Sequence, residues 1–381
     1  MSQLKKLEHI QLTINSLSFG KGAGVGRHQG FVVFVAKTCP GDVVLCEITL
    51  VKKNFAEARL LEIITPGKNR RTPPCPVAFE CGGCQWQQVS YERQLAEKQS
   101  LLLRTFSPLV SDPSKIAQIV ASPKEFGYRN RIQVHFKNGQ LGFLKQTSET
   151  LIPIEYCAIA EKVINDELPN VLKHDYKNSK KIEIRTNMSQ EVTITEVSLD
   201  DVGDRFSQVN SHVNEILLNH ILSWAPKTAK VACDLFSGNG NLTFPLAKLL
   251  KNTKFHAVEL GEHSHQIAQQ QAQNQNLTNI DFHNQSVESF LSKNFELKPD
   301  FIILDPPRAG LSTKAMTNLK RFSTPNLIYM SCDPMTLKRD LTELVKNGEY
   351  HIEKIQPFDM FPQTFHVEVL VALKKGDETA R

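Results

Sequence analysis

The chain has 381 residues, of which 40% are hydrophobic and 22% are charged. This balance is that of a globular protein and excludes a disordered or fibrous chain, and the length calls for two or three domains. No apolar run approaches a membrane span, and the N-terminal segment is too short and too polar for a secretory signal. We therefore expect a cytoplasmic protein with no membrane partner, whose eight cysteines stay reduced.

The formal net charge of +5 is unevenly distributed. Residues 1–150 hold 20 Lys and Arg against 11 Asp and Glu, whereas the remaining 231 residues hold 25 against 29. A basic front half joined to a mildly acidic back half suggests a surface that grips a polyanion, next to a catalytic unit. A basic surface that serves only solubility explains the charge equally well.

Residues 8–65 contain short alternating stretches separated by glycine turns, a pattern typical of a five-stranded barrel of the oligonucleotide-binding type. The stretch 20–27, GKGAGVGR, resembles the turn of a TRAM domain, an RNA-binding barrel. Because no helix pattern follows it, it is not a nucleotide-binding loop. We predict an RNA-binding barrel over residues 1–66. Its candidate phosphate contacts, each of which is alternatively a solvated charge, are Lys21, Arg27, Lys37, Lys52, Lys53 and Arg59.

Three cysteines follow within ten residues, Cys75, Cys81 and Cys84 in the spacing C-x5-C-x2-C. In a reduced chain such a group indicates metal binding, and Cys157 is the candidate for a fourth ligand. Four thiolates suit either an iron–sulfur cluster or a structural zinc. Zinc sites usually present two C-x2-C pairs, so the single pair favours iron and sulfur.

A β-rich central domain is predicted over residues 67–205, because residues 126–157 and 181–198 alternate in the manner of strands. It includes a helix over residues 91–106, with Lys98 on its outer face, that is a candidate to pack on the following domain.

Within the central domain, the segment FGYRNRIQVHF carries Tyr128, Arg129 and Arg131. Aromatic and guanidinium groups interleaved on a strand suit the stacking of unpaired bases and the binding of phosphates. An edge strand with solvated arginines is the alternative interpretation.

From residue 206 to residue 381, strands alternate with helices, which predicts a Rossmann-like α/β domain with a seven-stranded, mostly parallel sheet. A strand, a turn with Gly238 and Gly240, and a helix begin this domain. Glu259 ends the next strand, where an acidic residue suits hydrogen bonds to ribose hydroxyls. The third glycine of the dinucleotide pattern is replaced by Thr243, which favours S-adenosylmethionine over NAD.

Three further groups are expected at the same edge of the sheet. Cys332 follows an apolar strand, where an ionised thiol would be a good nucleophile, although free cysteines are more commonly small buried hydrophobes. Asp305 ends another strand before two prolines that restrict its backbone. Glu368 begins the last strand, which is antiparallel, so its carboxyl lies on the side of Cys332.

The motifs SCDP, LDPPRAG, FPQTFHVE, FSQVN and DLFSGNGNLT, together with the four cysteines, resemble the RNA 5-methyluridine methyltransferase family. The likeness covers nearly the whole chain and is greatest to the three-domain 23S rRNA enzymes with a TRAM domain and an iron–sulfur cluster. It implies a class I S-adenosylmethionine-dependent fold and a [4Fe–4S] cluster on Cys75, Cys81, Cys84 and Cys157.

The resemblance also implies a mechanism. The Cys332 thiolate adds to carbon 6 of uracil, carbon 5 then attacks the methyl group of S-adenosylmethionine, and Glu368 removes the proton from carbon 5. The uridine must be unpaired or flipped, and 23S rRNA is the expected partner of a monomeric enzyme. The residues that match positions for the cofactor or the pyrimidine are Gln208, Phe236, Asn241, Glu259, Ser286 and Asp305.

Two departures and three alternatives accompany this resemblance. Asp333 stands where the family often has asparagine and is expected to raise the pKa of the neighbouring thiol, and Gln363 stands where histidine is common. A tRNA T-loop methyltransferase and a catalytically inactive RNA-binding protein remain alternatives. A radical S-adenosylmethionine enzyme would need C-x3-C-x2-C with one open iron, which this chain lacks.

Overall fold

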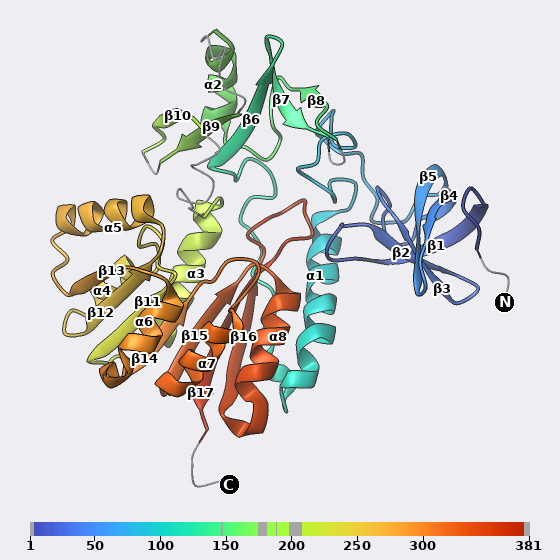
Figure 1. Ribbon diagram of the computed structural model, residues 1–381. Coiled ribbons are helices and arrows are strands. Elements are labelled where there is room, and N and C mark those ends of the chain that lie inside the picture. The colour runs from blue at the N-terminus through green and yellow to red at the C-terminus, as the bar shows by residue number, and fades with distance from the viewer. Residues whose placement is uncertain (1–3, 146–147, 174–180, 188, 198–207, 377–381) are drawn as a thin grey trace. The chain divides into compact units, whose positions relative to one another are not determined.

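The computed structural model describes residues 4–145, 148–173, 181–187, 189–197 and 208–376 (Figure 1). It divides into two compact units that are discontinuous in sequence. The first contains residues Met1–Lys98, Ser122–Ser198 and Phe361–His366, and the second contains Gln99–Ala121, Leu199–Met360 and Val367–Arg381. None of the described helices is long and apolar enough to cross a membrane.

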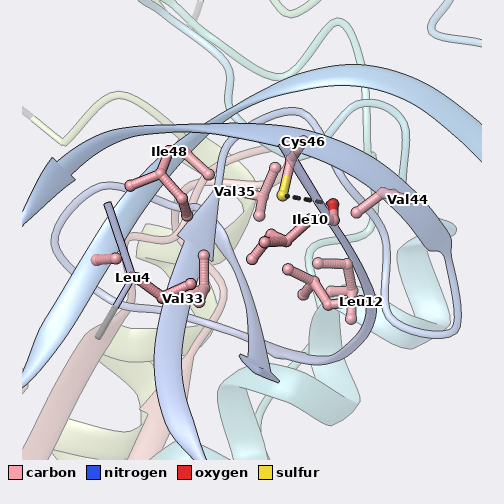
Figure 2. Close-up of a cluster of buried hydrophobic side chains, with 11 residues drawn as sticks. Leu4, Ile10, Leu12, Val33, Val35, Val44, Cys46 and Ile48 are labelled. Atoms are coloured by element: carbon pink, nitrogen blue, oxygen red, sulfur yellow. Dashed lines mark hydrogen bonds between the residues drawn. The ribbon is translucent and has the colours of Figure 1, made fainter. Parts of the chain in front are cut away.

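The first unit begins with a closed five-stranded barrel in the order β1-β2-β3-β5-β4. Alternate residues of its strands point inward, and Cys46 packs among them with its Sγ 3.6 Å from the carbonyl oxygen of Ile10 (Figure 2). Closure leaves no free strand edge, as expected for the predicted barrel. The strands are β1 (His9–Leu17), β2 (Gly24–His28), β3 (Phe31–Val35), β4 (Val43–Val51) and β5 (Phe55–Thr65).

The same unit contains an antiparallel sheet in the order β10-β9-β6-β7-β8. Helix α2 (Lys162–Lys173) packs on β9 and β10, and its Ile164 and Leu168 share a core with Ile182 and Ile184 of β9. The strands are β6 (Arg131–Lys137), β7 (Gln140–Leu144), β8 (Leu151–Pro153), β9 (Lys181–Thr186) and β10 (Val192–Glu196).

Two expectations for the first unit are wrong. Lys98 of α1 (Tyr91–Phe106) does not face solvent: its side chain is fully buried, lies over the Trp86 ring and donates to the carbonyl oxygen of Phe361 at 3.2 Å. Tyr128 is also buried, with its hydroxyl donating to the carbonyl oxygen of Pro362, so it offers no face to a base. Long-range polar partners outside the local pattern explain both burials.

The second unit contains a seven-stranded sheet in the order β13-β12-β11-β14-β15-β17-β16 (Figure 1). The first five strands in this order are parallel, and β17 runs antiparallel to both of its neighbours. The strands are β11 (Val231–Leu235), β12 (Lys254–Glu259), β13 (Ile280–Asn284), β14 (Phe301–Leu304), β15 (Asn326–Ser331), β16 (Tyr350–Phe358) and β17 (Glu368–Lys375). The predicted Rossmann-like sheet is therefore present.

Helices connect these strands, as the burial of both sheet faces requires. Strand β14 is buried along its whole length, and the chain reverses direction across the sheet between β11 and β14. In such sheets the ligand crevice opens at this switch point. The helices are α3 (Ser211–Trp224), α4 (Thr243–Leu249), α5 (Glu262–Asn274), α6 (Val287–Lys293), α7 (Thr313–Phe322) and α8 (Pro334–Val345).

Candidate active site

The strand ends of the second unit bring Cys332 and Glu368 to one edge of the sheet. Ser331, the last residue of β15, pairs with Val369 of the antiparallel strand β17. Cys332 and Glu368 are the next residues along these two strands, so the register carries them to the same level. Asp305 follows the last residue of β14, which is the other neighbour of β15. The three predicted groups therefore meet at the edge where ligands bind in such sheets.

Each of these three groups has a pKa displaced toward its neutral form. Burial, and then the nearby Asp305 carboxyl, raise the pKa of Glu368 well above its usual range. Burial raises the pKa of Asp305 to about 7. Burial, and then the charge of Glu368, raise the pKa of the Cys332 thiol to about 12. The edge thus contains acids that a cationic ligand would help to ionise.

Arg308 is a member of this group that the sequence analysis missed. The positive charge of its guanidinium, and then a hydrogen bond to the thiol, oppose the rise in the pKa of Cys332. The guanidinium also opposes the rise in the pKa of Glu368. The LDPPRAG motif contains Arg308, but its proximity to Cys332, 24 positions later, depends on the pairing of β14 with β15.

Asp333 caps a helix, whereas the sequence analysis expected it to raise the pKa of Cys332. Its carboxylate accepts hydrogen bonds from the backbone N–H groups of Met335 and Thr336, each at 3.0 Å, and so caps the N-terminus of α8. The acids that raise the pKa of Cys332 are Glu368 and Asp305. The expectation that Asp333 does so is wrong, because its charge is directed to the helix N-terminus.

Glu259, at the end of β12, connects the turn after β11 to the start of the turn after β12. Its carboxylate accepts from the backbone N–H of Gly238 at 2.9 Å and from that of Gly261 at 2.7 Å. Gly240, with φ of +91°, lies against the Phe244 ring, which leaves no space for a side chain. These contacts fix the shape of the turn after β11.

The other predicted crevice residues lie in the same unit. Phe236 has φ of +66°, an unusual conformation for a residue with a side chain. Asn241 exchanges hydrogen bonds with Asn214, and Ser286 caps α6 by accepting from the N–H of Ser289. Gln208 is buried just before α3. Phe206 and Ser207, which begin the FSQVN motif, lie outside the described residues.

Asp234, near the end of β11, is a second group that the sequence analysis missed. It is fully buried and accepts a 2.5 Å hydrogen bond from the Thr243 hydroxyl. Burial is the main cause that raises its pKa to about 7, and the nearby Glu259 adds to the rise. Asp234 also raises the pKa of Asp305. Asp234 is the first residue of the DLFSGNGNLT motif, but its burial and its nearness to Glu259 and Asp305 follow only from the pairing of the strands.

The four cysteines of the predicted metal site line a single cavity of about 260 Å³ in the first unit. Gly83 donates its N–H to Cys81 Sγ at 3.4 Å. Burial raises the pKa of the Cys84 thiol to about 12, and raises those of Cys81 and Cys157. Among the described residues, no three His, Cys, Asp or Glu side chains stand in an arrangement that holds a single metal ion.

The cavity also contains two of the arginines proposed for RNA. Arg129 and Arg131 both line it beside the cysteines. Arg131 lies on β6, which is an inner strand and not an edge, and its side chain faces Glu183. Arg131 therefore does not fit the edge-strand interpretation of this segment, and Arg129 precedes the strand.

The fold defines the class of the protein: a Rossmann-like α/β unit whose sheet edge carries Cys332, Asp305 and Glu368, in a chain that also contains a small β-barrel. The chain matches the family model described as tRNA (Uracil-5-)-methyltransferase over residues 178–376 and that of the TRAM domain over residues 5–61. It belongs to the tRNA (uracil-5-)-methyltransferase family, whose members are S-adenosylmethionine-dependent RNA uracil-C5 methyltransferases.

Similar proteins match nearly the whole length of the chain. An uncharacterized RNA methyltransferase of Bdellovibrio bacteriovorus is 39% identical over 96% of this chain and 95% of its own. The 23S rRNA (uracil(1939)-C(5))-methyltransferase RlmD of Shewanella sediminis is 29% identical over 97% and 94%. The crystal structure of the Pyrococcus abyssi tRNA (uracil-54, C5)-methyltransferase with S-adenosyl-L-homocysteine is similar in fold, with a TM-score of 0.76, 22% identity, and 96% and 100% coverage.

Proposed function

We propose that the chain methylates carbon 5 of one specific uridine in 23S rRNA through a covalent bond between Cys332 and carbon 6. The observation that carries this proposal is the meeting of Cys332, Glu368 and Arg308 at one edge of the sheet. Carbon 5 of uracil is a weak nucleophile, and addition of a thiolate to carbon 6 converts it into the carbon of an enolate. S-adenosylmethionine, when bound, supplies the electrophilic methyl group.

The residues at the edge have distinct parts in this reaction. Cys332 supplies the electron pair for the bond to carbon 6, and Arg308 stabilises the thiolate that attacks. After methylation, Glu368 takes the proton from carbon 5, and the returning electron pair expels the cysteine as a thiolate. The uracil must reach this edge as an unpaired or flipped base, because the atoms of a stacked base are inaccessible to side chains at a sheet edge.

The crevice chemistry supports S-adenosylmethionine as the methyl donor. Three carboxyls, the buried Asp234 and Glu368 and the partly exposed Asp305, have pKa values that are raised by desolvation and then by a neighbouring carboxyl. A sulfonium ion carries the positive charge that such a group lacks. We propose that Gln208, Phe236, Asn241, Glu259, Ser286 and Asp305 hold this cofactor or the pyrimidine.

We also propose that Cys75, Cys81, Cys84 and Cys157 hold a [4Fe–4S] cluster. The spacing of the cysteines supports iron and sulfur, because zinc sites usually present two C-x2-C pairs and this chain has one. The four cysteines all line one cavity of about 260 Å³. A cluster is bound at its corners by one cysteine each, and thiols that share a cavity are suited to that arrangement.

The rRNA substrate is inferred from whole-length relatives. RlmD of Shewanella sediminis, which matches both the barrel and the catalytic unit, is named for 23S rRNA. The Pyrococcus abyssi enzyme, which matches the same length, is named for tRNA, so the tRNA T-loop remains a second candidate. We further propose that the enzyme acts as a cytoplasmic monomer.

The decisive experiment incubates the protein with methyl-labelled S-adenosylmethionine and unmodified 23S rRNA or tRNA. We expect label in 5-methyluridine of 23S rRNA, and a loss of at least about a thousandfold in Cys332→Ala with cofactor binding retained. Label in tRNA alone would show that tRNA, and not 23S rRNA, is the substrate. Label in neither RNA would refute the proposed activity and favour a catalytically inactive RNA-binding protein. Cys233→Ala, a change at a buried core cysteine, is the matched control.

A further inference from the structure

The loop that carries Arg308 is buried at its two ends and exposed between them. Pro306 and Leu311 are buried, whereas Pro307, Arg308 and Ala309 are exposed. Residues 309–313 form one wall of an open groove beside α7 and α8. Hydrophobic burial therefore contributes little to the position of the exposed middle of the loop. Hydrogen bonds from the neighbouring elements must hold it, and these converge on one side chain.

That side chain is Asp340, on α8, whose carboxylate is 3% exposed. Its Oδ2 accepts from the backbone N–H of Leu311 at 2.9 Å and from the hydroxyl of Tyr329 at 2.6 Å. Leu311 ends the Arg308 loop, and Tyr329 lies on β15, the strand that leads into Cys332. A single carboxylate thus joins the loop to the strand of the nucleophile.

Arg339 extends this connection to the loop carbonyls. Its guanidinium bonds Asp340 Oδ1 through Nε at 2.8 Å and donates through Nη2 to the carbonyl oxygens of Ala309 and Leu311. Gly310 has φ of +72°, and a Cβ there would overlap Asp340 Oδ2 and the Arg339 guanidinium. The loop therefore approaches the pair as closely as a backbone can.

We propose that Asp340 is a positioning residue for the methyl-transfer reaction, which fastens residues 306–311 to β15 so that Arg308 is held against Cys332. This inference rests on the proposed function of Cys332. Asp340 lies behind the strand and touches no reacting atom. Its contribution acts through Arg308, whose guanidinium favours the thiolate form of Cys332 only while it stays beside the sulfur.

The test measures how fast iodoacetamide alkylates Cys332 in the full-length protein between pH 8 and pH 10, with the modified peptide quantified by mass spectrometry. The thiolate is the species that reacts. We expect Asp340→Asn to alkylate Cys332 about tenfold more slowly at each pH, which corresponds to a rise of about one unit in the pKa of the thiol. Arg308→Gln should give the same decrease, and the double variant should be no slower than either, because both act through one contact.

The matched control is Asp300→Asn. Asp300 also accepts two backbone N–H groups, from Lys230 and Val231, but at the amino end of β14. It should leave the alkylation rate of Cys332 unchanged. An Asp340→Asn protein that melts at lower temperature yet alkylates Cys332 at the wild-type rate, or faster, would overturn the proposal, because Asp340 would then only stabilise the fold.

If Asp340→Asn does not fold, Tyr329→Phe decides the question. This variant removes one hydrogen bond and leaves the carboxylate, so we expect a smaller decrease of the same sign, and an unchanged rate overturns the proposal. The measurement uses neither RNA nor S-adenosylmethionine. Failure of wild-type methyl transfer would therefore refute the proposed function and remain distinguishable from failure of this inference.

Discussion

At the scale of single residues, the site combines a thiol with carboxyls that oppose its ionisation. The charges of Glu368 and Asp305 both raise the pKa of Cys332, and Arg308 is the neighbouring group that lowers it. A thiol with a raised pKa is a poor nucleophile at rest. The Cys332 thiol ionises more readily when the two carboxyls are neutral or when a cationic ligand binds beside them. The reactivity of the thiol therefore depends on whether such a ligand is bound.

Glu368 offers a direct test of the proposed order of steps. Glu368 is 2% exposed and directly precedes Val369, which pairs with Ser331 at the end of β15, so its carboxyl lies at the level of Cys332. In Glu368→Gln, addition and methylation should proceed while the removal of the carbon 5 proton slows by about 10² to 10⁴. We therefore expect a covalent protein–RNA adduct that survives denaturing electrophoresis.

Two controls accompany this prediction. Glu353→Gln changes a carboxylate on β16 that lies near Lys374, away from the strand ends of the site, and should form no lasting adduct. The double change Glu368→Gln with Cys332→Ala should also form none. An adduct that persists without Cys332 would contradict the assignment of the nucleophile.

At the scale of elements, the carboxyl ends of β11 and β14 hold two aspartates with raised pKa values, Asp234 fully buried and Asp305 partly exposed. Asp234 and Asp305 each have a pKa of about 7, against a usual value near 4. The folded protein thus binds these protons more tightly than the unfolded chain does. The contribution to stability is present below about pH 4 and is lost as the pH rises through about 7.

Asp234→Asn should therefore flatten the pH dependence of stability. The free energy of unfolding of the ligand-free protein should fall between pH 5 and pH 8 in the wild type, and by at least about 1 kcal/mol less in the variant. Urea titrations at the two pH values measure this difference. Equal slopes in the two proteins would show that the Asp234 carboxyl is ionised in the fold. Asp300→Asn, at the opposite end of the sheet, is the control.

The segment of residues 75–84 has no regular secondary structure, and its three cysteines line the cavity of the predicted metal site. If it holds a [4Fe–4S] cluster, protein purified without oxygen should be brown and contain about four iron atoms per chain. Cys84→Ala should lose most of the iron, because the open corner exposes the cluster. Cys46→Ala, at a core cysteine of the barrel, should keep it. One zinc per chain without iron would contradict the prediction.

At the scale of the whole molecule, the basic charge is concentrated in the part that contains the barrel. Lys52 and Lys53 are exposed in the turn between β4 and β5. If they contact RNA phosphates, Lys52→Ala with Lys53→Ala should weaken RNA binding. The slope of log affinity against log salt should decrease by about 1 to 2, because fewer counterions are released.

The matched control removes the same charge elsewhere. Lys248 and Lys251 are exposed in the catalytic unit at the end of α4 and just beyond it. Lys248→Ala with Lys251→Ala should leave the salt slope unchanged. Equal decreases for the two pairs would mean that general charge, and not the barrel, attracts the RNA. Filter binding at several salt concentrations makes the comparison.

The patterns that predicted the fold are those that depend on residues close together in the sequence. Alternation along β1 and β4, the glycine turn after β11 and the apolar strand before Cys332 each follow from the geometry of neighbouring residues. The helix over residues 91–106 was predicted with the bounds that α1 has. Cys332 and Asp305 were placed at one edge by the rule that parallel strands present their carboxyl ends on one side. Glu368 was placed there because it begins an antiparallel strand.

What the tertiary structure alone decided are contacts between residues distant in sequence. Lys98 can be buried because its ammonium group donates a hydrogen bond to the carbonyl oxygen of Phe361. Tyr128 can be buried because its hydroxyl donates to the carbonyl oxygen of Pro362. Arg308 and Asp234 belong to the site because neighbouring strands carry them there. The sequence alone determines local features, such as which side chains alternate along a strand or share a helix face. Interactions between charges depend on distances that exist only in the folded chain.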